Sequence, residues 1–311
     1  MNVLIILLSV VTSIITNGQL LGKEDLANTA LIIGAGDEGR GDDVEFWPQR
    51  DESSCRSVEN LPFSLFSHSA AVLGHHVFTC GGSRIADTLD DCYAVDVVGD
   101  GVWQPAPSMR QNRKDFSLIA MEDYLLAIGG LNGSLYLDSV EMFDGETWTM
   151  EKFKLINPRY AHCSVKINDE EILVLGGGGY DGRLTSVEKV NIVDVTSIMF
   201  GSMTMTRMYF GCSFSEEENR VYVSGGWGTT SLVEYLDLNT QEWTRIANLN
   251  IGRDGHQMEI IGGKLTVFGG SGHDYNYIDS VEQYQASEDT WEMVESMQAA
   301  RYEMGMVPLA C

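Results

Sequence analysis

Pairs of glycines recur along this chain at nearly constant spacing, each directly after a run of β-branched, aromatic and aliphatic residues. They begin at Gly81, Gly129, Gly176, Gly225 and Gly269, so that the spacings are 48, 47, 49 and 44 residues. A repeat of this length indicates a series of similar small sheets that pack against one another. Glycine destabilises strand interiors but readily adopts the turn conformations that follow, so each pair is expected to end a strand.

Three further features recur within each repeat and mark its other strands. An Arg precedes the strand that leads to the glycine pair, a Val-Glu pair follows the glycines, and a Trp comes next in most repeats. The Val-Glu pairs begin at Val140, Val187, Val233 and Val281, and the tryptophans are Trp103, Trp148, Trp243 and Trp291. Four short antiparallel strands repeated at this period are typical of the blades of a β-propeller.

These repeats resemble the kelch-repeat family, whose repeats combine a glycine pair, an aromatic or acidic strand and a spaced Trp. Two repeats depart from this pattern. "DCYAVD" replaces the Val-Glu segment of the first, and Ile198-Met199 stands where the Trp of the third is expected. The resemblance extends over nearly the whole chain after its first apolar run. It implies a scaffold for protein interactions, in the form of a free-standing, secreted, six-bladed propeller.

The two ends of the chain together supply one more repeat. "ALIIGAG" places Gly34 47 residues before Gly81 and is followed by Val44-Glu45, whereas "RYEMGMVPL" near the C-terminus contains one strand without a glycine pair. We therefore predict an all-β fold of six four-stranded antiparallel blades, in which N- and C-terminal strands share one blade. Such closure removes the free sheet edges that promote aggregation. The alternative is a five-bladed ring with a loose N-terminal arm.

The chain begins with an uncharged apolar run, MNVLIILLSVVTSIITNGQLLG, in which the apolar part is too short to span a bilayer comfortably. Its position and its small and polar end are typical of a secretory signal, although the usual basic residue is missing. We predict a signal peptide at residues 1–18, a single propeller at 19–311, and a secreted, extracellular protein with no membrane span after signal removal. The alternatives are a membrane anchor or a buried strand.

The charge of the chain limits its partners. It contains 45 acidic and 20 basic residues, a net charge of -25, so its surface should repel nucleic acids and anionic membranes. The hydrophobic fraction of 44% is ample for a core, and the acidity is therefore no sign of disorder. We expect a monomeric ring that does not bind nucleic acid.

Six cysteines are an even number in a chain that is predicted to enter an oxidising compartment, which favours disulfides. The strand order predicts three bridges: Cys80–Cys92 across one short loop, Cys163–Cys212 between adjacent inner strands, and Cys55–Cys311 at the closure of the ring. Cys163 and Cys212 are assigned to the same strand position because each lies 13 residues before its glycine pair. Free buried thiols are the alternative for these two residues.

One glycosylation sequon, Asn132-Gly133-Ser134, directly follows a glycine pair in an expected surface loop. We therefore predict a glycan at Asn132. Neither a CxxC zinc pattern nor an HxxxH pattern is present, and no metal or other cofactor is predicted. His68, His162 and His256 fall near the same inner-strand position, but such residues more often pack or meet water than bind a metal.

Basic and aromatic residues are predicted to meet on one face of the ring. The repeat arginines precede the inner strands, and the loops after the glycine pairs add aromatic residues on the same face. The predicted binding residues are Arg113, Arg159, Arg207, Arg253, Arg301, Tyr180, Trp227, His273, Tyr275 and Tyr277. Arginine forks suit carboxylates, and exposed aromatics form interface hot spots, so we predict an extracellular protein, acidic peptide or glycan as partner. The alternative is that the arginines pair with carboxylates of their own blades.

No catalytic motif is recognisable. The chain has neither a Gly-x-Ser-x-Gly elbow nor a glycine-rich phosphate loop that ends in Lys-Ser/Thr, and we predict that it is not an enzyme. The alternative is a kelch-type enzyme, a sugar isomerase, lyase or oxidase-like protein, with a pocket at the channel mouth. A compact cluster of acids and bases with shifted pKa values at one mouth would favour that alternative.

Overall fold

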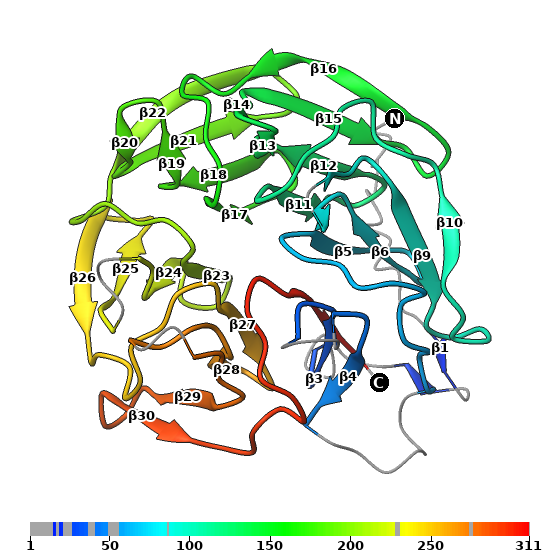
Figure 1. The fold of residues 1–311 in the computed structure, drawn as a ribbon. Helices are drawn as coiled ribbons and strands as arrows, with labels where there is room; N and C mark the ends of the chain where they lie inside the picture. The colour runs from blue at the N-terminus through cyan, green and yellow to red at the C-terminus, as the bar shows by residue number, and fades with distance from the viewer. Residues whose placement is uncertain are drawn as a thin grey trace, which may run out of the picture.

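The computed structural model is a closed ring of small β-sheets around a central channel (Figure 1). It describes residues 15–16, 19–20, 27–36, 41–48, 56–85, 87–227, 231–273 and 276–310. These residues form strands and turns and no helix, so no helix among them could cross a membrane. The predicted all-β propeller is confirmed.

Five blades contain four antiparallel strands each, and we name each blade by its first repeat glycine. Within each blade the strands are given from the channel outwards. The Gly81 blade contains β5 (Ser69–Leu73), β6 (His76–Cys80), β9 (Cys92–Asp96) and β10 (Gln104–Ala106), and the Gly129 blade contains β11 (Ser117–Ala120), β12 (Leu125–Ile128), β15 (Ser139–Phe143) and β16 (Trp148–Lys154). The Gly176 blade contains β17 (Cys163–Lys166), β18 (Glu171–Leu175), β21 (Ser186–Asn191) and β22 (Thr196–Ser202); the Gly225 blade contains β23 (Gly211–Ser215), β24 (Arg220–Ser224), β25 (Val233–Asp237) and β26 (Glu242–Ile246); and the Gly269 blade contains β27 (Gln257–Ile261), β28 (Lys264–Phe268), β29 (Val281–Gln285) and β30 (Thr290–Met293).

The sixth blade is assembled from both ends of the chain. Its inner strand is β31 (Gly305–Leu309), which pairs antiparallel with β3 (Thr29–Ile33), and β3 pairs with β4 (Val44–Trp47). Because β31 also contacts β5 and β27, the six inner strands form a continuous ring. The closure predicted from the sequence is confirmed, and the five-bladed alternative is wrong. Cys55, one end of the disulfide predicted at this closure, lies outside the described residues.

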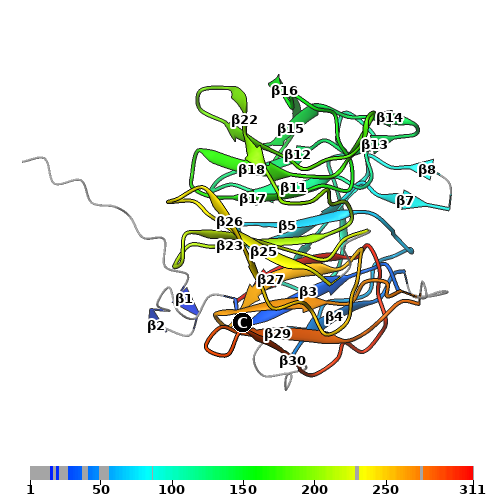
Figure 2. The same cartoon turned by 90° about the vertical axis from the view of Figure 1, so that its left-hand side faces the viewer.

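The loops that follow the glycine pairs project from one face of the ring, which we call the glycine-loop face. Three of them contain short hairpins: β7 (Ser83–Arg84) with β8 (Asp87–Thr88), β13 (Leu131–Asn132) with β14 (Leu135–Tyr136), and β19 (Gly178–Gly179) with β20 (Gly182–Arg183). Figure 2 shows β7, β8, β13 and β14 on one side of the ring and the small pair β1 (Ile15–Thr16) and β2 (Gln19–Leu20) on the other. Because the strands of a blade alternate in direction, the connections from each outer strand to the next inner strand also lie on the glycine-loop face.

The second strand of each blade is buried on both sides, which explains its unbroken apolar sequence. β12 and β18 are examples, and their apolar residues pack in clusters that cross from blade to blade. Three of the repeat tryptophans add a polar link to this packing. The indole nitrogen of Trp148 donates to the carbonyl of Pro107, and Trp103 and Trp291 make the corresponding bonds, all at 2.9 Å.

The regular position of the glycine pair within each repeat has a steric reason, shown by the Gly176 blade. Gly177 has a φ of 93°, and a Cβ at this position would lie 2.6 Å from the carbonyl oxygen of Tyr160. The amide of Gly177 instead donates to the carbonyl of Arg207, in the next blade, at 2.8 Å. A side chain at Gly177 is thus excluded by the segment that leads into the inner strand of its own blade, and one at Gly176 by the connection to the next blade, because its Cβ would lie 2.8 Å from the carbonyl oxygen of Arg207.

A buried Arg–Glu pair lies at the equivalent place in five of the six blades. The pairs are Arg113–Glu141, Arg159–Glu188, Arg207–Glu234, Arg253–Glu282 and Arg301–Glu45. In each pair the Arg precedes the inner strand, and the Glu lies in the third strand counted from the channel. The glutamates are those of the Val-Glu segments, so two separate motifs of the repeat form one contact.

The Gly269 blade shows how such a buried charge pair is satisfied. Arg253 donates to the carbonyls of Gly269 at 2.8 Å and Ser280 at 2.9 Å, and to Glu282 Oε1 at 2.6 Å. Glu282 Oε2 accepts the backbone amide of Asn250 at 2.7 Å. Burial of two charges is tolerated only when such additional hydrogen bonds accompany the ion pair. The pair therefore ties together the inner strand, the glycine turn and the incoming connection.

The Gly81 blade has no such pair, and a disulfide lies nearby instead. Leu65 occupies the position of the Arg. Its carbonyl accepts the amide of Ala35 at 3.1 Å, just as the carbonyl of Arg207 accepts the amide of Gly177. Cys80 and Cys92 are directly opposite one another in β6 and β9 and form a disulfide. The departure from Val-Glu in "DCYAVD" thus coincides with a covalent link between the same two strands.

The second predicted disulfide, Cys163–Cys212, is also present and joins the inner strands of adjacent blades. The assignment of both residues to the same strand position is wrong by one residue. Cys163 lies opposite Leu175, one residue before Gly176, whereas Cys212 lies opposite Val223, two residues before Gly225, because the β23–β24 hairpin is one residue longer than the β17–β18 hairpin. Both ends of the predicted Cys55–Cys311 bridge lie outside the described residues, as do Tyr275 and nearly all of the predicted signal peptide, so these remain predictions.

Replacement of Glu188 by Gln should show how strongly the fold depends on the Arg–Glu pairs. The substitution leaves the guanidinium of Arg159 buried without its counter-charge, which should lower the free energy of unfolding by about 3–5 kcal/mol. Lys154→Ala is the matched control, because Lys154 pairs with Asp138 on the surface, where loss of an ion pair should cost about 1 kcal/mol or less. Urea titration of both variants measures the difference, and equal losses would contradict the expectation.

Candidate binding site at the channel mouth

The repeat arginines do not form an exposed binding rim. All five side chains are buried, and their guanidinium groups are directed to the carbonyls and glutamates of their own blades. The prediction that Arg113, Arg159, Arg207, Arg253 and Arg301 contact a ligand is therefore wrong, and the pairing with blade carboxylates is what the structure shows. The basis for an acidic partner is lost with it.

The aromatic part of the predicted site is exposed. Tyr180 is 65% exposed, Trp227 is 54% exposed, and Tyr277 and His273 are also accessible on the glycine-loop face. Two other loops of this face carry exposed aliphatic side chains, Ile85 and Leu135. The glycine loops of five consecutive blades thus each place one exposed apolar or aromatic side chain on this face. We call Ile85, Leu135, Tyr180, Trp227 and Tyr277 the rim residues.

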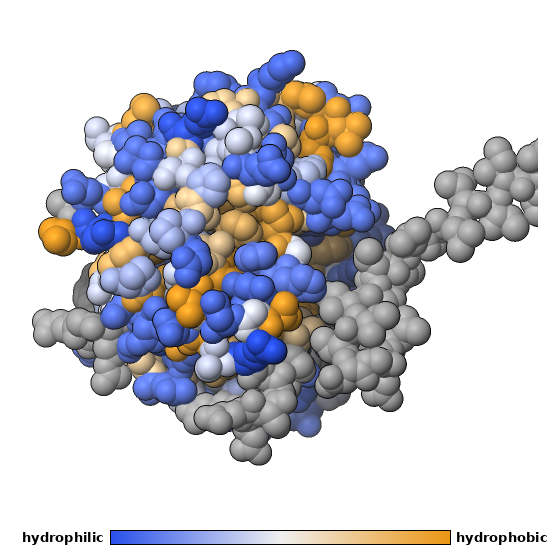
Figure 3. All heavy atoms as spheres, turned by 90° about the vertical axis from the view of Figure 1, so that its right-hand side faces the viewer, coloured by the Kyte–Doolittle hydropathy of each residue, from blue (hydrophilic) through white to orange (hydrophobic). Residues whose placement is uncertain are grey.

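The outer wall of the propeller differs from this face. Figure 3 views the ring from the side where β9 and β10 lie, and apolar residues there are scattered among hydrophilic ones. Exposed apolar atoms of this kind are ordinary for a protein surface. On the glycine-loop face, by contrast, the rim residues are placed regularly, one in the glycine loop of each of five blades.

Six residues, one from each blade, surround the mouth of the channel on the glycine-loop face. We call them the mouth ring: Ser67, Asp115, Ala161, Tyr209, Gly255 and Glu303. Each has a left-handed backbone, with φ between 48° and 60°, and each comes just before the first residues of an inner strand. The conformation costs an L-residue about 1–2 kcal/mol. Its recurrence in all six blades shows that the surrounding structure imposes it.

Backbone hydrogen bonds run from blade to blade around the mouth ring. The amide of Asp115 donates to the carbonyl of Ser67 at 3.0 Å, and the amide of Ala161 donates to Asp115 at 2.8 Å. The same bond continues to Tyr209, Gly255 and Glu303, with distances between 2.7 and 3.0 Å. Glu303 and Ser67, at the closure of the ring, are joined by a hydrogen bond from the Ser67 hydroxyl to the Glu303 carboxylate. The mouth therefore has a defined backbone that carries six different side chains.

Tyrosine rings form a continuous row across the mouth, which we call the tyrosine belt. In order of contact they are Tyr180, Tyr136, Tyr160, Tyr209, Tyr302 and Tyr277, with neighbouring ring centroids 4.6 to 6.5 Å apart. Tyr136 and Tyr160 stack, as do Tyr277 and Tyr302. The belt connects two of the rim residues through the mouth ring.

Three carboxylates lie among these tyrosines and have raised pKa values. Burial raises the pKa of Asp115 to about 7, with a further contribution from the negative charge of Glu303. Burial likewise raises the pKa of Glu303, and that of Asp254 to about 6. Hydroxyls of Ser67, Tyr209 and Tyr302 donate to these carboxylates and only partly offset the burial. The mouth is therefore a desolvated, acidic and aromatic site.

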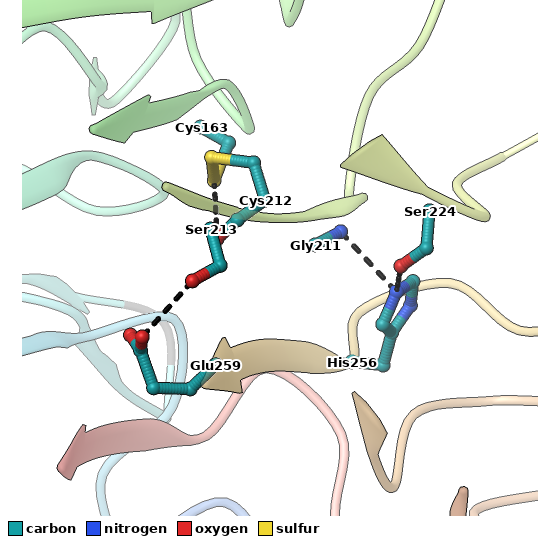
Figure 4. The surroundings of a disulfide bond; sticks show 7 residues. All are labelled: Cys163, Gly211, Cys212, Ser213, Ser224, His256 and Glu259. Carbon is teal, nitrogen blue, oxygen red and sulfur yellow. Dashed lines mark hydrogen bonds between the residues drawn. A yellow bond between two sulfur atoms is a disulfide. The ribbon is translucent and has the colours of Figure 1, made fainter. Parts of the chain in front are cut away.

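The channel below the mouth is lined by three histidines, each directly before an inner strand, at the equivalent positions that their spacing predicts. Burial lowers the pKa of His68 to about 4 and that of His162 to about 3, so both rings are neutral at physiological pH. His256 is also buried, and its Nε2 lies 3.2 Å from the amide of Gly211 and 2.8 Å from the hydroxyl of Ser224 (Figure 4). Among the described residues, no group of three His, Cys, Asp or Glu side chains is arranged to hold a metal ion.

Beyond the histidines the channel widens to a cavity of about 510 Å³. Its wall includes the Cys163–Cys212 disulfide and Glu259, whose carboxylate accepts a hydrogen bond from Ser213 at 3.0 Å (Figure 4). Burial raises the pKa of Glu259. On the mouth side of the histidines, a smaller pocket of about 90 Å³ is enclosed by the mouth ring.

The carboxylates of the mouth escaped the sequence analysis, although the repeat contains a signal for them. Asp115, Tyr209 and Glu303 each lie two residues after a repeat Arg, and Asp254 lies one residue after. Alignment of the repeats on the arginines would have placed these residues together at the mouth. The arginines are the more conspicuous feature of these segments, because basic side chains are few in an acidic chain.

Replacement of Asp115 by Asn should make the protein more stable at alkaline pH. Since the pKa of Asp115 is about 7 in the folded protein, against an ordinary value of 3.8, the folded state retains a proton that the unfolded state releases. The contribution of Asp115 to stability is therefore largest below pH 4 and is lost as the pH rises to 7. Asp115→Asn removes this loss, and we expect a gain on the order of 1–3 kcal/mol at pH 8 that shrinks towards pH 4.

Thermal unfolding of wild-type and Asp115→Asn protein between pH 4 and pH 8 measures this effect. Asp138→Asn is the control, because it removes a partly exposed carboxylate of the same face that pairs with Lys154, and it should not stabilise the protein at pH 8. A variant that is no more stable than the wild type at pH 8 would contradict the assigned burial of a charge at Asp115.

Comparison with known proteins agrees with the architecture. A family model described as Kelch motif matches residues 112–151, 218–250 and 252–298, which correspond to the Gly129, Gly225 and Gly269 blades. The matched segments contain the glycine pair and the Val-Glu strand of each of these blades.

Several kelch-like proteins are similar to the chain over most of its length. It is 26% identical to human Kelch-like protein 34 over 267 residues, which cover 81% of this chain and 34% of that protein. It is 28% identical to Kelch-like protein 36 of Bos taurus over 255 residues, 74% of this chain and 40% of that protein, and 24% identical to mouse Kelch-like protein 23 over 273 residues, 85% and 48%. The chain thus spans less than half of the length of these relatives. The chain is therefore similar to kelch motifs in three of its blades and, at 24–28% identity, to kelch-like proteins over most of its length.

Proposed function

We propose that this chain is a protein-interaction module that binds an extracellular protein partner through its glycine-loop face. The observation that carries the proposal is the set of rim residues, one exposed apolar or aromatic side chain in the glycine loop of each of five consecutive blades. Exposed Tyr and Trp side chains next to a polar pocket are the residue types that dominate interface energetics. The similarity to kelch-like proteins supports the same class of function.

The distribution of exposed aromatic residues supports this choice of face. Among the large apolar side chains of the described residues that are strongly exposed, the aromatic ones are Tyr180, Trp227 and Tyr277, and all three lie on the glycine-loop face. The opposite face exposes Val98, Val193 and Val195 in its turns. These are small aliphatic residues, which contribute less to interface hot spots.

A catalytic function is the second candidate, because acids and neutral histidines with shifted pKa values lie together at the mouth. The mouth pocket, at about 90 Å³, is smaller than the roughly 300–1,000 Å³ of most substrate sites, but the adjoining cavity of about 510 Å³ lies within that range. The exposed rim residues, and not the pocket size, therefore place binding ahead of catalysis. A turnover screen with sugars and other small metabolites, run on wild-type and Asp115→Asn protein, distinguishes the two. Turnover that depends on Asp115 would favour the enzyme.

The choice of face can be tested with peptides selected from a random display library on the immobilised wild-type protein. Selected peptides should bind Tyr180→Ser/Trp227→Ser protein at least about tenfold more weakly, because loss of two aromatic anchors removes more than about 1.4 kcal/mol of binding free energy. Val98→Ser/Val193→Ser protein is the control, since it removes exposed apolar side chains from the opposite face. Equal binding to all three proteins would overturn the proposed face.

We also propose that the protein acts outside the cell, as a secreted glycoprotein. The Cys80–Cys92 and Cys163–Cys212 disulfides support an oxidising compartment. Asn132 lies in β13, and the next two residues of its sequon are exposed at the tip of the hairpin, where a glycan can be accommodated. Expression in a secretory animal cell should release protein that begins near residue 19 and loses mass with an N-glycosidase. Retention of residues 1–18, or the same mass for Asn132→Gln and wild-type protein, would contradict the respective part of the proposal.

A further inference from the structure

We infer that the mouth pocket receives a positively charged side chain, an arginine or a lysine, from the protein that binds the glycine-loop face. This inference rests on the proposed function, since the cation is supplied by the partner. The charge of the ligand is thus opposite to that expected from the sequence, which predicted exposed arginines and an acidic partner.

The shape of the pocket limits what can enter it. It is enclosed by the mouth ring above and by His68, His162 and His256 below, among other residues, and holds about 90 Å³. Since a cavity needs only about 10–15 Å³ of such space to hold one water molecule, the pocket has room for several waters. It can accept the head group of one side chain but not a folded segment of a partner.

The charge of the pocket is incompletely balanced by the chain itself. Asp115 and Glu303 both line it, and Asp254 lies next to Glu303 through the hydroxyl of Tyr302. Lys114 acts on Asp115 and Glu303 at a distance, but among the ion pairs of the described residues none joins it to either carboxylate. The five repeat arginines are bound to their glutamates. A cation from outside would supply the balance that these carboxylates lack.

His162 adds an unused hydrogen-bonding group to the same pocket. It is 8% exposed, and neither of its ring nitrogens has a hydrogen-bond partner among the described residues. In the equivalent histidines, His68 and His256, Nε2 accepts the amide of a glycine in the neighbouring inner strand, Gly305 and Gly211 respectively. The ring of His162 lies in the pocket wall with a free lone pair, because a neutral imidazole always has one unprotonated nitrogen.

The difference between His162 and the other two histidines has a steric cause. A Cβ at Gly305 would lie 2.6 Å from Nε2 of His68, and one at Gly211 would lie 2.9 Å from Nε2 of His256. The corresponding first residue of the neighbouring strand β11 is Ser117, which has a Cβ. His162 therefore cannot approach that backbone in the same way. An arginine or lysine N–H could donate to it.

The tyrosine belt provides favourable surroundings for the stem and the charge of such a side chain. Tyr209 belongs both to the pocket wall and to the belt, and Tyr160 and Tyr302 flank it. A cation near the face of a tyrosine ring is attracted by the negative potential of that face, more strongly as it is desolvated. An acidic side chain would instead meet two buried carboxylates and would be repelled.

Occupancy should depend on pH, because a cation binds the ionised form of the carboxylates. The charged and titratable groups around Asp115 are Glu303, Asp254, Lys114, Tyr160, Tyr209, Tyr302, His68, His162 and His256. Of these, the histidines have pKa values lowered by burial and the tyrosines have pKa values raised by it, so the carboxylates dominate between pH 5 and 8. Binding should be tighter at pH 8 than at pH 5.5.

The test uses two tripeptides, acetyl-Gly-Arg-Gly-amide and its citrulline counterpart, which has nearly the same shape without the charge. In titrations followed by NMR of the full chain at pH 8, the arginine peptide should shift the signals of Tyr209 and Tyr302 and bind at least about tenfold more tightly than the citrulline peptide. Asp115→Asn and Glu303→Gln should each weaken it about fivefold or more, as should pH 5.5 for the wild type. Asp138→Asn changes the net charge equally on the same face and should leave the affinity unchanged.

Equal binding of the two peptides would overturn the inference, and so would an equal loss in Asp138→Asn, which would indicate a general attraction to an acidic protein. Failure of the proposed function is separately visible. If binding of the library peptides depends on Tyr180 and Trp227 but the peptides show no preference for arginine or lysine, the result supports the interaction face and contradicts the cation site. Asp115→Asn is expected to be folded, and its melting temperature verifies this in every titration.

Discussion

The buried Arg–Glu pair is the interaction on which the rest of the structure depends. Each pair fixes an inner strand to the third strand of the same blade, and the backbone of the same Arg accepts the amide of a repeat glycine in the preceding blade. A charge in the interior is costly unless its hydrogen-bonding capacity is used. The ring meets this condition with the carbonyl of a repeat glycine at every pair, with backbone amides of the incoming connection at four of the five glutamates, and with serine hydroxyls at Arg113, Arg159 and Arg253. The electrostatic contact therefore also defines the loop geometry on the glycine-loop face.

The sequence predicted most of the fold because the repeat encodes it redundantly. The glycine pairs, Val-Glu strands and tryptophans each give the same period, and the closure by β31 and β3 follows from the two incomplete repeats at the ends. Two disulfides were also predictable, since the strand order brings Cys80 to Cys92 and Cys163 to Cys212. The one-residue error for Cys212 came from the length of the β23–β24 hairpin, which periodicity does not determine.

The site was less predictable, because the role of a charged residue depends on what lies opposite it. Arg253 and Glu282 are 29 residues apart, and sequence spacing alone does not show that their side chains neutralise one another. Once they do, the five most conspicuous basic residues no longer face a ligand. Asp115 and Glu303 differ from the arginines because, among the described residues, neither is paired with an opposite charge of its own blade. Each lies at a repeat position with a left-handed backbone, where burial makes its negative charge costly.

The mouth ring separates architecture from chemistry. Its hydrogen bonds from blade to blade use backbone amides and carbonyls, and its six positions already accommodate glycine, alanine, serine, tyrosine and two acids. The side chains there can therefore be exchanged while the blades and their charge pairs stay in place. Substitution of the six mouth-ring residues, by natural mutation or by design, would give the same scaffold an apolar, basic or aromatic mouth.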